Sequence, residues 1–318
     1  MHKNKDYGLT TFIANKKIES NNIGRIIKQT NHTYTVATKS KIVEHVKQIR
    51  TKKEKKKNLN SPYVVGDYVR LIKKEEHYFL GEILDRKNVL SKSESKAKKS
   101  YRKQIVEQLV ASNIEHVFIT VSTDQRFTLS KLERYILTFT VPAATIDILI
   151  TKSDYNEQAT YIENYIEASE LNINIYKISI YNEDSINQIK KRITSNSTSI
   201  LLGSSGTGKS SLINMLTDGE QEKTGVVRTD GKGKHTTTYS TIIPIDNSNS
   251  YIIDTPGIKS ISTTRETKEI LFEDILALSK QCKFRDCNHN SEPGCAVKEA
   301  IRLGNLNAQK LERFHKYL

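Results

Sequence analysis

The 318-residue sequence has few cysteines, no long hydrophobic runs and, in its first third, few acidic side chains. No stretch approaches the roughly eighteen consecutive apolar residues that a membrane-spanning helix needs. The first residues, Met1 to Lys5, also lack the apolar core of a secretory signal peptide. We therefore expect a soluble cytoplasmic protein that has no membrane partner.

The three cysteines all lie within fourteen residues, and with one histidine they follow the spacing C-x4-C-x-H-x5-C. Three thiolates and one imidazole complete a tetrahedral Zn²⁺ shell, and a closed shell indicates a structural metal. No cysteine is left for a disulfide, which fits a reducing compartment. The alternative is three unrelated reduced thiols, but their clustering favours one zinc ion. The predicted ligands are Cys282, Cys287, His289 and Cys295.

The scarcity of acidic residues makes the first third strongly basic. Residues 1–105 hold 26 Lys and Arg against 10 Asp and Glu, whereas the other residues hold 24 against 26. Such an asymmetric excess indicates a polyanionic partner such as nucleic acid. The alternative is the solvated surface of a Lys- and Asn-rich composition. Two basic runs, residues 47–57 and 92–103, are expected to be loops, and the second also a linker.

Residues 20–90 have the pattern of short strands separated by turns. β-Branched and aromatic residues alternate with polar ones at 23–27, 34–38, 63–71 and 78–84. A five-stranded OB-type barrel fits this length, and such barrels commonly bind oligonucleotides. From residue 105 the pattern changes to alternating strands and helices, which is typical of a parallel sheet.

A glycine-rich loop, Gly203 to Ser210, lies between a short apolar strand and a helical pattern. Its sequence is G-x4-G-K-S, in which main-chain N–H groups and the helix N-terminus converge on phosphate oxygens. Lys209 is expected to reach the β- and γ-phosphates, and Ser210 to ligate Mg²⁺. A Gly/Ser-rich linker is the alternative, but the flanking elements argue against it. The expected nucleotide contacts are Gly203, Ser204, Ser205, Gly206, Thr207, Gly208, Lys209, Ser210 and Ser211.

Three further strand ends carry residues suited to a guanine nucleotide. The first is D-T-P-G at residues 254–257, in which Asp254 can hold Mg²⁺ through water and the Gly257 N–H can meet the γ-phosphate.

The second strand end carries T-K-S-D, which consists of Thr151, Lys152, Ser153 and Asp154. Asp154 can accept from the guanine N1–H and N2–H₂ groups, which adenine does not offer together, and the stem of Lys152 can pack along the base. Ser179 ends the next strand, where a main-chain amide can meet guanine O6.

The order of these elements is rotated relative to translation-factor-like GTPases, because T-K-S-D precedes the phosphate loop. A permuted GTPase between a β-barrel and a cysteine cluster resembles the RsgA (YjeQ) family of small-ribosomal-subunit-dependent GTPases. The resemblance covers nearly the whole chain, including Gly66-Asp67, Asp85 to Asn88, Gly233 to Thr238, D-T-P-G and the cysteine cluster. Two departures are Thr151, where the family usually has Asn, and Ile180, where Ala is common.

The resemblance implies an α/β fold in three parts. An OB-fold-like barrel with basic loops and a linker is expected over residues 1–104, and a circularly permuted P-loop GTPase domain over 105–265. A small helical zinc-binding domain is expected over 266–318.

The motifs above do not identify the residue that orients the attacking water. Ile258 follows D-T-P-G, where many GTPases place a Gln. His235 is the nearest candidate, and RsgA-like proteins carry His at this position; the alternative is a loop histidine with no catalytic role. One of Thr236, Thr237 and Thr238 is expected to close on Mg²⁺, and we choose Thr237.

The resemblance also implies a function. We expect a monomer that hydrolyses GTP to GDP and phosphate, is stimulated by the small (30S) ribosomal subunit, and acts in late assembly through 16S rRNA. One alternative is a nucleotide-stabilised RNA-binding protein with little stimulated turnover. A P-loop small-molecule kinase is a third reading, but such an enzyme has no use for T-K-S-D.

Overall fold

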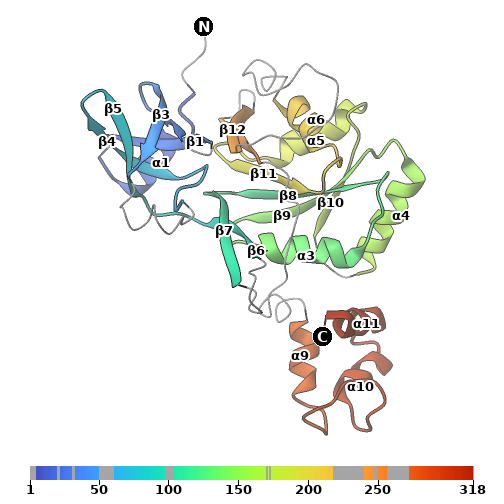
Figure 1. Cartoon of the computed structure of the whole chain (residues 1–318). Coiled ribbons are helices and arrows are strands. Elements are labelled where there is room, and N and C mark those ends of the chain that lie inside the picture. The colour runs from blue at the N-terminus through green and yellow to red at the C-terminus, as the bar shows by residue number, and fades with distance from the viewer. Residues whose placement is uncertain are drawn as a thin grey trace.

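The structure is a computed structural model of the chain (Figure 1). It describes residues 5–19, 22–30, 33–49, 61–96, 104–169, 171, 173–217, 240–245, 249–255 and 272–317. A β-barrel, a central α/β sheet and a C-terminal group of helices follow one another along the chain. Among the described residues, no helix is long and apolar enough to cross a membrane.

The N-terminal part is the predicted five-stranded barrel. Its strands are β1 (Ile23–Gln29), β2 (Tyr34–Thr38), β3 (Ile42–Gln48), β4 (Tyr68–Lys74) and β5 (His77–Ile83). They pair in the order β1-β2-β3-β5-β4, and β4 returns to β1, which closes the barrel. Only β3 and β5 pair in parallel within this ring. The buried residues of the interior are Ile26, Val36, Val43, Val46, Val69, Leu71 and Leu80. Val43 and Val46 belong to β3, which the periodicity did not predict. The expectation of a loop over residues 47–57 is wrong for residues 47–48, which end β3, while 50–60 lie outside the described part.

Helix α1 (Leu9–Lys16) packs on the barrel, and the sequence analysis did not predict it. Leu9 and Ile13 are buried with Ile23 and Tyr68 in a small apolar cluster. The ring of Phe12 stacks on Tyr68, with 3.7 Å between the ring centroids. The helix therefore covers apolar side chains of β1 and β4.

A hairpin of β6 (Val89–Lys96) and β7 (Gln104–Ser112) leads out of the barrel. Its register pairs Lys92 with Gln108 and Lys96 with Gln104. The expectation of a loop throughout residues 92–103 is therefore wrong for residues 92–96, while 97–103 lie outside the described part. The charged composition misled the prediction, because antiparallel pairing uses main-chain groups that every non-proline residue carries.

The central sheet has the order β10-β9-β8-β11-β13-β12. All its neighbouring strands are parallel except β12, which is antiparallel to β13. The strands are β8 (His116–Ser122), β9 (Thr145–Thr151), β10 (Asn174–Ile178), β11 (Thr198–Gly203), β12 (Ser240–Ile245) and β13 (Ser250–Asp254). The connecting helices are α3 (Leu129–Phe139), α4 (Asn156–Glu167), α5 (Glu183–Arg192) and α6 (Lys209–Leu216).

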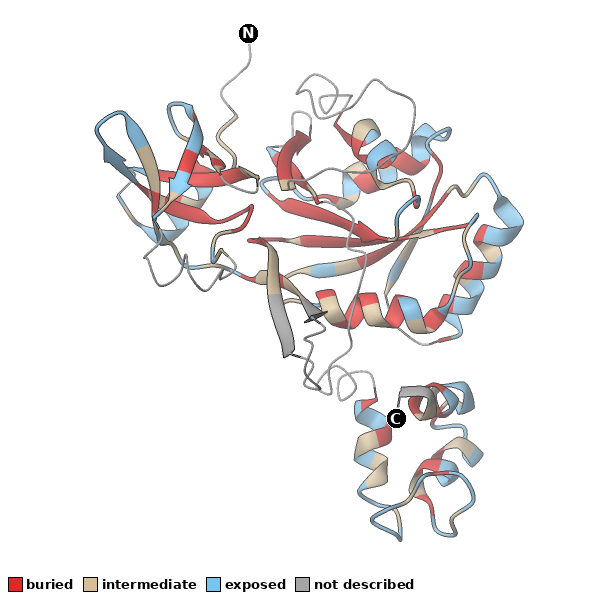
Figure 2. Cartoon of the chain, in the orientation of Figure 1, coloured by how far each residue is buried: buried red, intermediate tan, exposed pale blue. Residues whose placement is uncertain are grey.

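Helices cover both faces of this sheet. Val117, Ile119, Ile148 and Ile150 pack with α3 and α4 in one apolar cluster. Their neighbours Phe118 and Leu149 pack with α5 and α6 in another. A strand that is buried on both faces needs an uninterrupted apolar run, which explains the sequence pattern of these strands. Figure 2 shows the result as strands that are buried along much of their length.

The barrel and the central sheet are continuous. Strand β12 pairs antiparallel with β1, placing Lys28 opposite Thr241 and Gln29 opposite Ser240. In the part of the chain that the structure describes, eleven strands thus form one sheet. Main-chain hydrogen bonds therefore fix the barrel against the α/β part.

A buried arginine joins the same two parts. Arg25 on β1 is 2% exposed, and its guanidinium donates to the Tyr7 carbonyl at 3.1 Å and the Gly66 carbonyl at 3.3 Å. It also donates to Thr198 Oγ1 on β11 at 2.8 Å. Its Cζ lies 4.9 Å from the centroid of the Tyr68 ring. One side chain thus holds the N-terminal segment, the barrel and the α/β part together.

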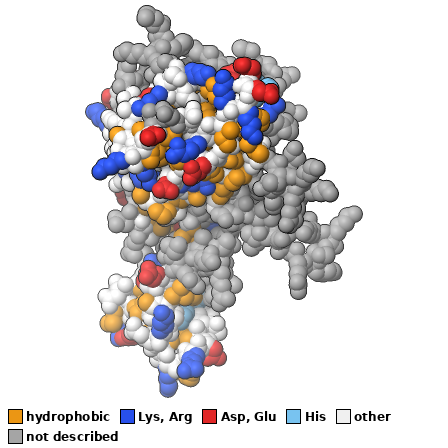
Figure 3. Space-filling view, turned by 90° about the vertical axis from the view of Figure 1, so that its left-hand side faces the viewer, with side chains coloured by type: hydrophobic (Ala, Val, Ile, Leu, Met, Phe, Trp, Pro, Cys, Tyr) orange, Lys and Arg blue, Asp and Glu red, His pale blue; other side chains and the backbone are white. Residues whose placement is uncertain are grey.

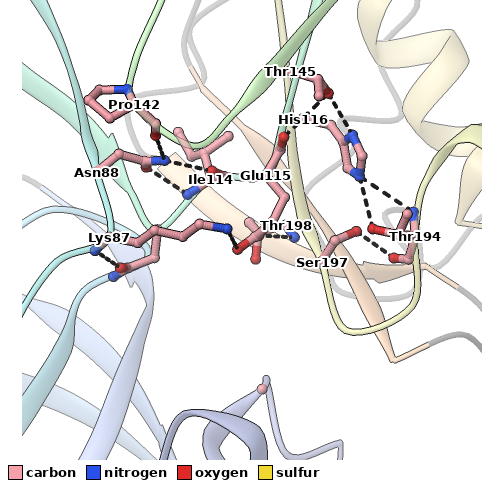
Figure 4. Close-up of polar contacts among 12 residues, drawn as sticks. Lys87, Asn88, Ile114, Glu115, His116, Pro142, Thr145, Thr194, Ser197 and Thr198 are labelled. Atoms are coloured by element: carbon pink, nitrogen blue, oxygen red, sulfur yellow. Dashed lines mark hydrogen bonds and ion pairs between the residues drawn. The ribbon is translucent and has the colours of Figure 1, made fainter. Parts of the chain in front are cut away.

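A polar network next to this arginine orders the chain where it enters β8 (Figure 4). The Asn88 side-chain amide donates to the carbonyls of Ile114 and Pro142, and its oxygen accepts from Ile114 N. Glu115 accepts from Thr198 N at 2.7 Å and pairs with Lys87 at 3.3 Å. These bonds link the hairpin to the amino ends of β8 and β11.

The C-terminal module contains α9 (Glu273–Ser279), α10 (Ala296–Arg302) and α11 (Ala308–Tyr317). It has its own small core, in which Phe272, Ile275, Val297 and Phe314 are buried. Arg313 on α11 forms an ion pair of 2.8 Å with Glu133 on α3, and both side chains are largely buried. This pair holds the module against the α/β part.

We predict that Arg25→Met lowers the free energy of unfolding by about 2–4 kcal/mol, because it leaves several buried oxygens without their donor. The shift in the first unfolding transition in urea, followed by circular dichroism, measures this loss. The matched control is Arg70→Met, which removes a surface ion pair with Glu82 and should cost less than about 1 kcal/mol. Equal losses in both variants would contradict the bridging role of Arg25.

Candidate nucleotide site and metal centre

The carboxyl ends of the parallel strands meet at one edge of the sheet, the usual place for a ligand in such folds. A cavity of about 290 Å³ lies there. It is lined by residues in and beside the T-K-S-D motif and the phosphate loop, and by residues of the loop after β8 and the end of β10: Asp124, Thr151, Lys152, Asp154, Tyr155, Ile178, Ile180, Tyr181, Gly208, Ser211 and Leu212. The two predicted motifs therefore share one cavity although the chain carries them in rotated order.

Glycines shape the phosphate loop. Gly206 and Gly208 have φ of 81° and 80°, in the left-handed region that favours glycine. A Cβ on Gly203 would lie 2.1 Å from Thr120 Oγ1 on β8, so a side chain there would collide with the neighbouring strand. Gly208 caps α6, whose N-terminus points its free N–H groups into the loop.

Lys209 lies folded over this loop. Its Nζ donates to the carbonyl oxygens of Gly203 at 2.9 Å and Ser204 at 2.6 Å. Burial lowers the pKa of Lys209, and the charge of Asp254 acts in the opposite direction. The ammonium is thus held close to the place where the loop would cradle phosphate, with the carboxylate that ends β13 nearby.

Threonines connect the phosphate loop to the two strands beside it. Thr207 Oγ1 lies 2.7 Å from Thr120 Oγ1, and Thr120 Oγ1 donates to the Leu202 carbonyl at 3.0 Å. Thr151 Oγ1 lies 2.8 Å from the Thr207 carbonyl and 3.2 Å from that of Val121. The Thr151 hydroxyl therefore joins the T-K-S-D motif to the phosphate loop from a buried position.

The T-K-S-D residues and Ser179 are held by hydrogen bonds. Ser179 Oγ donates to Asp154 Oδ1 at 2.8 Å and accepts from Tyr181 N. The main-chain amide of Ser179 itself donates to Ser185 Oγ at 3.2 Å. Lys152 Nζ donates to the Gly206 carbonyl at 3.3 Å and to a carboxylate of the loop after β8. Asp154 is thereby oriented within the cavity by a neighbouring hydroxyl.

Several predicted residues cannot be placed. Gly257, His235 and Thr236 to Thr238 lie outside the described residues, so their roles remain predictions. Ser210 lies in the first turn of α6, and Asp254 ends β13.

Sequence reasoning missed the loop that runs from the last residue of β8, Ser122, to Gln125 and contacts both motifs. It matches no motif, but its place after a buried parallel strand was a usable signal.

The four predicted zinc ligands come together in the C-terminal module. The ligand atoms of Cys282, Cys287, His289 and Cys295 all lie within 4.8 Å of one another. The Sγ atoms of Cys282 and Cys295 are 3.9 Å apart, and His289 Nδ1 lies 3.6 Å and 3.3 Å from them. Zn–S bonds of about 2.3 Å in a tetrahedron give S···S edges of about 3.8 Å. The donor set therefore fits a structural zinc ion.

Ser279, which the sequence analysis missed, orients the histidine ligand. Its hydroxyl donates to the Ile275 carbonyl at 2.7 Å, and its oxygen lies 2.9 Å from His289 Nε2. Because the hydroxyl hydrogen is used by the carbonyl, the oxygen accepts from Nε2–H. The lone pair of the ring is then on Nδ1, which faces the cysteines, and such outer contacts commonly fix metal-binding histidines.

Comparisons with known proteins agree with this arrangement. The family described as RsgA GTPase matches residues 83–264. Small ribosomal subunit biogenesis GTPase RsgA 2 of Listeria monocytogenes is 32% identical over 98% of this chain and 87% of its own. The RsgA 1 protein of Listeria innocua is 33% identical, also over 98% of this chain and 87% of its own.

Two solved structures have a similar fold. YjeQ from Thermotoga maritima has a TM-score of 0.62 at 23% identity, over 93% of this chain and 96% of that one. YloQ, described as a circularly permuted GTPase, has a TM-score of 0.57 at 25% identity, over 93% of both chains. The permuted motif order read from the sequence agrees with that description.

We predict that the wild-type protein binds about one zinc ion per chain. In Ser279→Ala the zinc affinity should fall about 10- to 100-fold, because His289 loses its orienting partner. Competition with a chromogenic chelator measures the affinity. Ser291→Ala, which changes an exposed serine of the same module, is the control and should bind zinc like the wild type. Unchanged affinity in Ser279→Ala would show that the hydroxyl does not orient the ligand.

Proposed function

Since this chain belongs to the RsgA family of small ribosomal subunit biogenesis GTPases, we propose that it binds GTP and hydrolyses it to GDP and phosphate while bound to the maturing small (30S) subunit. The observation that carries the proposal is the shared cavity. Asp154 and the phosphate loop line it together, so that a base and its phosphates can be held at once.

The base end of this cavity suits guanine. The Asp154 carboxylate can accept from N1–H and N2–H₂ of guanine, and Ser179 holds that carboxylate in place. The Lys152 stem can cover the base while its ammonium stays on the Gly206 carbonyl. Tyr181, which is 84% exposed, and Tyr155 add aromatic surface to the same cavity.

The phosphate end suits a Mg²⁺-bound triphosphate. The N–H groups of the loop and of α6 favour anionic oxygens, and Lys209 adds a charge for the β- and γ-phosphates. Ser210 and, through water, Asp254 offer the oxygen ligands that Mg²⁺ prefers. We further propose that Gly257 contacts the γ-phosphate, that Thr237 closes on Mg²⁺ and that His235 orients the attacking water. Ile258 follows the D-T-P-G motif and has no group that can do so.

The barrel supports an RNA partner. Lys41, Lys47, Lys73 and Lys74 are exposed on β3, β4 and the residue before β3, beside the exposed Ile42 and Ile72. Figure 3 shows Lys and Arg side chains interspersed with hydrophobic ones on this side of the molecule. Such a surface can neutralise phosphates and contact bases, as expected for 16S rRNA. We propose that the barrel and the zinc module contact rRNA.

Asp154→Asn should weaken GTP and GDP binding by about 10- to 100-fold, because a carboxylate acceptor for two donors is lost. The same variant should bind xanthosine nucleotides better than the wild type does, since the donor and acceptor pattern is reversed. Titration with fluorescent nucleotides measures both effects. Asp85→Asn, which changes an exposed carboxylate of the barrel side, should bind GDP normally. Equal affinity of the wild type for ATP and GTP would contradict the assignment of Asp154.

The proposed function is tested by GTP hydrolysis with and without purified 30S particles. We expect the particles to raise turnover by about tenfold or more, because the free protein lacks a Gln after D-T-P-G and a docked partner can order the site. Binding should be tighter with a non-hydrolysable GTP analogue than with GDP, and should weaken steeply with salt. Lys209→Ala is the inactive control.

If 30S particles neither stimulate turnover nor bind preferentially in the GTP state, the proposal fails. A nucleotide-stabilised RNA-binding protein with little turnover would then be the better account.

A further inference from the structure

The loop that runs from the last residue of β8, Ser122, to Gln125 contacts both halves of the nucleotide site without belonging to either motif. Thr123 N donates to the Thr151 carbonyl at 3.3 Å, and Thr123 Oγ1 donates to the Lys152 carbonyl at 2.9 Å. On the other side, Gln125 Nε2 donates to the Ser205 carbonyl at 2.9 Å. One short loop therefore ties the T-K-S-D motif to the phosphate loop.

Asp124 is the acidic member of this loop and lines the cavity. Its Oδ2 lies 2.5 Å from Lys152 Nζ, and its Oδ1 accepts from Ser122 Oγ. The hydrogen bonds from Lys152 and Ser122 hold the pKa of Asp124 below its ordinary value, so the carboxylate is charged at neutral pH. The Lys152 ammonium is thereby fixed at two points, Asp124 and the Gly206 carbonyl.

Both the backbone and the side chain of Lys152 need neighbouring groups to hold them in this conformation. Its backbone has a φ of 56°, in the left-handed region that costs a non-glycine residue energy, and Thr123 holds its carbonyl. Its long side chain would otherwise lose rotamer freedom, at a cost of up to about 2 kcal/mol, each time it is ordered against a base. A side chain that is already fixed at its ammonium avoids much of that cost on binding.

We propose that Asp124 is a positioning residue for Lys152 and that it thereby raises the affinity of the cavity for the guanine base. The inference rests on the proposed function, since it concerns the same site. Asp124 and Lys152 have side chains that are 45% and 36% exposed. Because solvent screens such a pair, its effect on affinity is modest, about fivefold at most.

The experiment measures GDP binding to the full-length protein with a fluorescent GDP analogue, which requires neither hydrolysis nor ribosomes. Asp124→Ala should weaken binding by about three- to fivefold. Asp124→Asn keeps an oxygen acceptor and should weaken it by a smaller factor. Glu163→Ala is the matched control, since it removes a partly exposed ion pair with Lys177 that lies outside the cavity lining, and it should bind GDP like the wild type.

A double-mutant cycle with Lys152→Met separates positioning from general damage. Methionine keeps an apolar stem but has no ammonium for Asp124 to hold. If Asp124 acts through Lys152, Asp124→Ala should cause no further loss in the Lys152→Met background. The inference is overturned if Asp124→Ala binds GDP normally, or if it causes the same loss in both backgrounds. A wild-type protein that does not bind GDP would refute the proposed function itself, and this inference with it.

Discussion

The parallel register of β9, β8 and β11 is the constraint on which the nucleotide site depends. In this register Gly203 lies opposite Thr120, and Ser122 lies opposite Thr151. The phosphate loop, the loop after β8 and the T-K-S-D motif therefore leave the sheet at the same edge. A shift by one residue would turn the side chains of a strand to the other face, so the apolar residues buried on both faces hold this register.

Because the site is set by which strands are neighbours, the order of the motifs along the chain matters little. β11 lies between β8 and β13, so the phosphate loop lies between the T-K-S-D side and Asp254. The permutation instead changes what is attached to each part. β12 pairs with β1 of the barrel, and the segment after β13 leads to the zinc module. Both flanking parts are thus joined to β12 and β13, the two strands on the Asp254 side of the phosphate loop.

The C-terminal module is small, and its few buried apolar residues form a limited core. A module of this size commonly needs a metal or disulfides for stability, which agrees with its Cys₃His cluster. Its attachment to α3 includes the largely buried pair of Arg313 and Glu133. Loss of one partner would leave an uncompensated buried charge, so both residues are needed to hold the module against α3.

The sequence by itself determined the barrel, the α/β pattern, the phosphate loop, the guanine motif and the four clustered Cys and His residues. Each is visible in local spacing, because strand periodicity, a glycine loop and metal-ligand spacing involve residues close together in the chain. Only the tertiary structure decided the pairing of β12 with β1, the bridge from Arg25 to Thr198, the contacts of Asp124 and Ser279, and the strand at residues 92–96. Arg25 and Thr198, for example, are 173 positions apart. Such contacts depend on strand register and on the packing of distant elements, and local sequence patterns carry no information about either.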